Sequence, residues 1–272
     1  MGRLLLQLVR GFVVGLAGLL PGLSGSAFLV LFHLYRPVMA ALAYPCAGFW
    51  ENLRRLGPFF LAAGLGMLAG SHVLAGLLAR HETAMLYLFM GFIAGSLPDL
   101  FRHARRTQGS HYGWLAFAVL FLLCVGLAAL PNRVVPRGET LAGHWGIWLL
   151  TGAGVGLGSI VPGASVALIL IYFGIYRPML MGIANLDPGV LVPVALGAGA
   201  AIILFARVSH WLFQKAEGPA TRGILGLIVG SLWLAYPGWP GGAAGARGLL
   251  LFLLGAALSA LLNKLAPEPP RP

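Results

Sequence analysis

Long apolar stretches dominate the chain, and polar residues interrupt them only briefly. A membrane-spanning helix needs about 20 consecutive, mostly apolar residues. The stretches that meet or approach this length are residues 58–79, 84–101, 113–131, 188–213, 219–237 and 247–266. They lack the alternation of a membrane barrel, so the sequence predicts an all-α polytopic membrane protein.

Two further apolar stretches, residues 11–35 and 152–176, are each interrupted near the middle by Pro-Gly. Proline removes a hydrogen bond from the helical ladder, and glycine permits the backbone to turn. Each stretch is therefore predicted to be a re-entrant hairpin of two half-helices, which returns to the side of the membrane from which it entered.

The two broken stretches are copies of one another. Residues 11–37 and 152–178 align at an offset of 141 without a gap, and 12 of 27 positions are identical. A shorter match joins GFIAGSL at 91–97 to GLIVGSL at 226–232. Close helix packing, as in GxxxG motifs, explains glycines such as Gly11 and their copies. It does not explain a repeated PGxS followed by Tyr-Arg-Pro.

The chain is thus predicted to consist of a first repeat, residues 1–140, and a second repeat, residues 141–272, each with one broken segment and three spans. Because three crossings separate the two copies, the second repeat is inverted relative to the first. An inverted repeat with paired broken helices is typical of transporters whose binding site lies between the repeats.

Composition and charge support a membrane location. Only 9% of the 272 residues are charged, against about a quarter in soluble domains, which excludes a soluble globular protein. The net charge of +11 is too sparsely distributed for nucleic-acid binding. If both broken stretches are re-entrant, twelve Lys and Arg lie on the side of the termini and five on the other. The positive-inside rule then places both termini in the cytoplasm.

The two Pro-Gly breaks are candidate anion sites. Backbone N–H groups lose their helical partners there, and the following half-helix presents the positive end of its dipole, where phosphate commonly binds. Glycines would let a headgroup approach the backbone, and serines would donate hydroxyl hydrogen bonds or cap their own half-helices. The candidates at the breaks are Pro21, Gly22, Ser24, Gly25, Ser26, Pro162, Gly163 and Ser165.

Three arginines extend this set. Arg36 and Arg177 follow the two breaks at matching positions. The planar guanidinium suits phosphate, but an arginine at a helix end also snorkels to the interface, and both interpretations stay open. Arg207 follows a long uncharged run, where an ionisable residue is a functional candidate. Supporting candidates are Tyr35 and Tyr176, otherwise aromatic-belt residues, and His33, otherwise a packing residue.

The segments VGLAGLLPGLSGSAFLVLFHLYRPV at 14–38 and VGLGSIVPGASVALILIYFGIYRPM at 155–179 resemble the paired signatures of the bacterial polyprenyl-phosphate transporters. The resemblance implies translocation of undecaprenyl phosphate, or a related polyprenyl phosphate, from the outer to the inner leaflet of the cytoplasmic membrane. This returns the carrier lipid of cell-wall biogenesis, with the headgroup bound at the paired PG-x-S loops. The family often has an acidic residue where this chain has Arg36 and Arg177, so an acidic coupling role has no support here.

Two other functions compete with this one. The same broken helices and arginines would serve a transporter or channel for a small anion. An intramembrane lipid phosphatase would need carboxylates and metal, whereas neither broken segment contains Asp or Glu. We therefore expect no enzyme activity, catalytic residue, metal or cofactor. The expected partners are the lipid and the bilayer, and the sequence leaves open the coupling ion and whether the chain forms a homo-oligomer.

Overall fold

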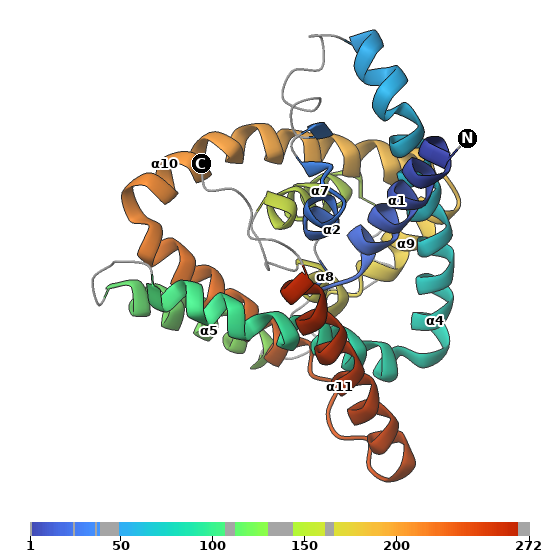
Figure 1. Cartoon of the computed structure of the whole chain (residues 1–272). Coiled ribbons are helices and arrows are strands. Elements are labelled where there is room, and N and C mark those ends of the chain that lie inside the picture. The colour runs from blue at the N-terminus through green and yellow to red at the C-terminus, as the bar shows by residue number, and fades with distance from the viewer. Residues whose placement is uncertain are drawn as a thin grey trace.

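The structure, a computed structural model, describes residues 2–23, 25–35, 37–38, 49–106, 112–129, 144–160 and 166–265. All regular elements in these ranges are helices (Figure 1). They are α1 (Gly2–Leu19), α2 (Gly25–Leu31), α4 (Phe49–Arg106), α5 (Tyr112–Ala129), α7 (Trp145–Ile160), α8 (Val166–Tyr172), α9 (Tyr176–Ala184), α10 (Pro188–Ala235) and α11 (Gly242–Leu265).

Several of these helices are suited to a bilayer. Within the described residues, Arg54–Arg102, Gly218–Ala235 and Gly242–Leu265 are long and apolar enough to cross a membrane. Helices α8 and α9 form a pair bent by 105°, which would make a fourth span if counted as one. Many large apolar side chains on the outer helices are exposed, as a hydrocarbon environment allows. The expected all-helical membrane protein with several apolar spans is confirmed.

The predicted stretches 58–79 and 84–101 lie on either side of a kink in α4, where His81 leaves the helical conformation with φ −138° and ψ 45°. The stretches 188–213 and 219–237 lie largely within α10. At about 1.5 Å per residue, helices of this length greatly exceed the hydrocarbon core of about 30 Å. Each helix bends into two arms (Figure 1).

We call residues 54–80 and 82–102 the first and second arms of α4, and residues 188–204 and 218–235 the first and second arms of α10. The half-helix that leads into each break packs on the first arm of its own repeat. An added Cβ on Gly15 in α1 would lie 2.7 Å from the carbonyl carbon of Ala63 in α4. An added Cβ on Gly156 in α7 would lie 2.9 Å from the Cα of Ala198 in α10. Glycine therefore serves helix packing at these positions, as the sequence predicted.

The third span of each repeat packs on the other repeat. A Cβ on Gly91 in α4 would lie 3.0 Å from the Cα of Phe252 in α11, and one on Gly226 in α10 would lie 2.8 Å from the Cα of Phe117 in α5. Gly91 and Gly226, and likewise Phe117 and Phe252, are 135 residues apart. The two contacts are thus one contact made twice, with the third spans exchanged between the repeats.

This exchange makes Gly226 intolerant of a side chain. We expect Gly226→Ala to destabilise the protein by about 1–3 kcal/mol, because the new methyl group overpacks the contact with Phe117. The matched control is Gly126→Ala in α5, where an added Cβ meets nothing within 4 Å. It is expected to be neutral or to stabilise by about 0.5–1 kcal/mol. Unfolding temperatures in detergent would measure both, and equal shifts would contradict the exchanged packing.

Candidate functional site

The first break is a tight turn pressed against α4. Helix α1 ends at Leu19, and the turn is closed by a 3.1 Å hydrogen bond from the Leu23 N–H to the Leu20 carbonyl. Pro21 is fully buried, and Gly22 adopts a φ of +82°. A Cβ on Gly22 would lie 2.7 Å from the backbone nitrogen of Ile93 in the second arm of α4. Glycine is needed here both for the backbone conformation and for this close approach.

Beyond the break, α2 lies back along α1. The Arg10 guanidinium in α1 lies 5.7 Å from the centre of the Phe32 ring, just after α2. Val14 of α1 and Leu29 of α2 pack on the same small cluster around Phe59. Arg10 precedes Val14 in α1, whereas Phe32 follows Leu29 in α2, so the two half-helices run in opposite directions.

The second break lies outside the described residues, but its two flanking helices are described. The Val166 side chain at the start of α8 is 3.0 Å from the Cβ position of Gly154 in α7. Gly154 precedes the last residue of α7, Ile160, by more than one helical turn. The beginning of α8 therefore lies beside α7 rather than continuing beyond its end.

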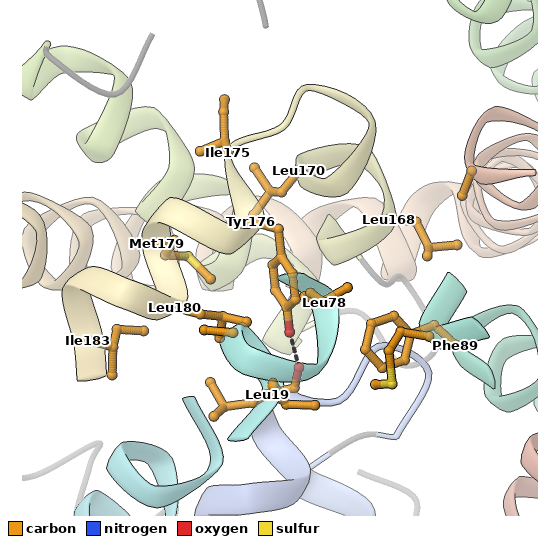
Figure 2. Packing of buried hydrophobic residues seen from close by; sticks show 14 of the residues in the cluster. Leu19, Leu78, Phe89, Leu168, Leu170, Ile175, Tyr176, Met179, Leu180 and Ile183 are labelled. Atoms are coloured by element: carbon orange, nitrogen blue, oxygen red, sulfur yellow. Dashed lines mark hydrogen bonds between the residues drawn. The ribbon is translucent and has the colours of Figure 1, made fainter. Parts of the chain in front are cut away.

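The two broken segments meet at Tyr176. This tyrosine begins α9, is 2% exposed, and donates its hydroxyl hydrogen bond to the Leu19 carbonyl at the end of α1 (Figure 2). Leu19 and Tyr176 share one buried cluster with Leu168, Leu170 and other apolar side chains, which together come from α1, α4, α7, α8, α9 and α10. A residue of the second repeat thus holds the backbone next to the break of the first. Tyr176 is a core residue and not an aromatic-belt residue.

Three further candidates are described by their exposure and local contacts. Tyr35 is half-buried, and Arg177 follows Tyr176 on α9 with an exposed side chain. His33 is exposed, and its Nδ1 lies 3.1 Å from the Leu31 carbonyl oxygen. It adopts a φ of +60°, and Gly174 at the matching position of the second repeat has a φ of +70°. Both positions terminate a half-helix, which gives His33 a structural role beside any chemical one.

The other candidates cannot be placed in the same way. Ser24, Arg36, Pro162, Gly163 and Ser165 lie outside the described residues. Gly25 and Ser26 belong to α2 and Arg207 to α10, but their side-chain environments also lie outside the described part. No group of three or more His, Cys, Asp or Glu side chains within the described ranges is arranged to hold a metal ion.

Sequence reasoning missed two features of this region. Arg10 counted only as a topology charge, because its contact with Phe32 depends on the register of a hairpin that no local pattern fixes. The role of Tyr176 was also missed, although its repetition in both Tyr-Arg-Pro motifs was a signal. The sequence pattern of a tyrosine at a helix end is identical whether the side chain lies at the lipid interface or bonds a buried carbonyl.

Comparison with known proteins adds the family. A sequence model of undecaprenyl phosphate translocase-like proteins matches residues 2–113 and 108–244. The chain belongs to this family. The two matched segments, one in each half of the chain, agree with an internal repeat.

Two relatives of this chain carry the name polyprenyl-phosphate transporter. The one from Staphylococcus aureus is 24% identical over 277 residues, covering 97% of each chain. The one from Vibrio cholerae is 22% identical over 244 residues, covering 84% of this chain and 76% of the relative. No solved structure matches the chain. The relatives are transporters, not enzymes, in agreement with the expectation for this chain.

The geometry of the first break predicts a sharp difference between two nearby glycines. Gly22→Ala would force a Cβ into a left-handed conformation, at a cost of about 1–2 kcal/mol, and against the Ile93 backbone as well. Gly18→Ala in α1 meets nothing within 4 Å and should stabilise by about 0.5–1 kcal/mol. We expect Gly22→Ala to lower the unfolding temperature in detergent and Gly18→Ala to leave it unchanged or raise it. The reverse order would show that the first break is not the tight turn described.

Proposed function

We propose that this protein translocates undecaprenyl phosphate, or a related polyprenyl phosphate, from the outer to the inner leaflet of the bacterial cytoplasmic membrane. Family membership and the polyprenyl-phosphate transporters of two bacteria support the substrate class. The observation that carries the proposal within this chain is the meeting of the two broken segments at the Tyr176–Leu19 hydrogen bond. It puts a residue of one copy at the break of the other.

The headgroup, in this proposal, binds between the two breaks while the isoprenoid tail remains in lipid. A phosphate cannot enter hydrocarbon unaided, because burying a charge without partners is very costly. Hydroxyls of Ser24, Ser26 and Ser165 would replace part of its water shell. Arg36, Arg177 and Arg207 are the candidate positive partners. Close packing of Gly22 against Ile93 implies that the phosphate approaches from the opposite side of that turn.

We further propose that both broken segments are re-entrant and that both termini are cytoplasmic. The return of α2 along α1 and the position of Val166 beside Gly154 support the hairpins. The exchanged contacts of Gly91 and Gly226 support an internal twofold relation between the repeats. The two breaks would then approach the middle of the membrane from opposite sides, and alternating access would expose the site to each leaflet in turn.

A lipid-flip assay in liposomes tests this function. Wild-type protein should move a fluorescent polyprenyl phosphate between leaflets, and Ser24→Ala combined with Ser165→Ala should abolish most of that transport. The matched control is Ser96→Ala combined with Ser231→Ala, a second repeat-related pair. Each of these hydroxyls donates a 2.8 Å hydrogen bond to a carbonyl of its own helix.

Two outcomes would count against the proposal. Full transport by the Ser24 and Ser165 double variant would remove these serines from the site. Flux of a small anion through the wild-type protein without movement of the lipid would favour the anion-transporter alternative. Measuring the initial rate with lipid supplied to one leaflet at a time would test the inward direction.

A further inference from the structure

The first break deprives the Leu19 carbonyl of its usual helical hydrogen-bond donor, and the Tyr176 hydroxyl takes the place of that donor. In a continuous helix the Leu19 carbonyl would accept from the N–H of Leu23. That N–H bonds the Leu20 carbonyl instead, at 3.1 Å, because the chain turns at Pro21. The carbonyl at the end of α1 then needs another donor, and the hydroxyl of Tyr176 supplies it from a residue 157 positions away.

Packing alone does not require a hydroxyl at position 176. The ring lies among apolar side chains of α1, α8 and α9, including Leu19, Leu170 and Leu180, as Figure 2 shows. A phenylalanine would fill the same space, whereas a buried hydroxyl must find a partner. The specific contribution of the tyrosine is therefore the hydrogen bond that fixes the end of α1, two residues before Pro21.

We propose that Tyr176 is a positioning residue for the headgroup site, and that Tyr35 performs the same task for the other repeat. Tyr35 and Tyr176 are 141 residues apart, as are Leu19 and Ile160. The twofold relation then pairs the Tyr35 hydroxyl with the Ile160 carbonyl at the end of α7. Each repeat would orient the Pro-Gly break of the other. This inference rests on the proposed function, since it concerns the site at which the headgroup binds.

The first test compares two tyrosine-to-phenylalanine variants. Tyr172 also donates to a backbone carbonyl, but to that of Leu127 in α5, at 2.8 Å, and not to α1. Both Tyr176→Phe and Tyr172→Phe lose one such hydrogen bond, so their unfolding temperatures should fall by similar amounts. Only Tyr176→Phe should weaken binding of polyprenyl phosphate, by about fivefold, the factor that corresponds to one hydrogen bond.

Tyr35→Phe should weaken binding as Tyr176→Phe does. Unchanged affinity in Tyr176→Phe, or the same loss in Tyr172→Phe, would overturn the positioning role. Unchanged affinity in Tyr35→Phe would overturn its reciprocal half. Failure of the wild-type protein to bind or flip the lipid would instead contradict the proposed function, so the two failures are distinguishable.

A second measurement does not depend on transport or on purified protein. In a variant with Cys46→Ser and Cys124→Ser, the substitution Leu23→Cys introduces a single cysteine whose reactivity reports the accessibility of the first break in native membranes. Adding Tyr176→Phe should speed its reaction with a thiol reagent severalfold, because the end of α1 loses its anchor. Adding Tyr172→Phe should leave the rate unchanged. Equal rates in all three backgrounds would show that Tyr176 does not hold the break.

Discussion

Backbone hydrogen bonding in hydrocarbon is the constraint on which this architecture depends. A helix satisfies its own polar groups, so any break inside an apolar stretch must be covered by other protein groups. At the first break, the Leu19 carbonyl is covered by the Tyr176 hydroxyl, and Gly22 packs directly on the Ile93 backbone. The break exists in this form only because the second repeat and the second arm of α4 lie against it.

The packing of α5 on α10 and of α11 on α4 likewise makes each half of the chain depend on the other. Helix α5 packs on the second arm of α10, and α11 packs on the second arm of α4, so neither repeat buries the glycines of its second arm, Gly91 and Gly226, by itself. Side chains near the ends of these pairs also correspond. Arg222 donates from Nε to the Ala104 carbonyl at 3.3 Å, and Tyr87, 135 residues earlier, donates to the Gly238 carbonyl at 3.0 Å. The repeats are interdependent units rather than independent domains.

The position of the first break could be predicted from the sequence, whereas contacts between residues far apart in the chain could not. Pro21-Gly22 predicted the first break because proline and glycine act on their own backbone. The form of the kink at His81 in α4 was not predictable, since a polar tip without proline or glycine can be a loop or a sharp bend between two helices. The exchange of α5 and α11 was also hidden, because Gly91 and Gly226 would show the same spacing whichever helix covered them.

The proposed inversion of the second repeat explains which residues the two copies share and which they do not. Both copies keep the glycines, the proline and the tyrosine of the motif. In the first copy, Pro21 and Gly22 form a tight turn, and such backbone geometry does not depend on which side of the membrane a copy faces. Two charged positions differ, although Arg36 and Arg177 are kept: Arg222 corresponds to Tyr87, and Arg10, which lies over the Phe32 ring, corresponds to Thr151. In the proposed topology, both arginines lie toward the cytoplasmic side, where positive charge is favoured. At these two positions, charge therefore distinguishes one copy of the repeat from the other.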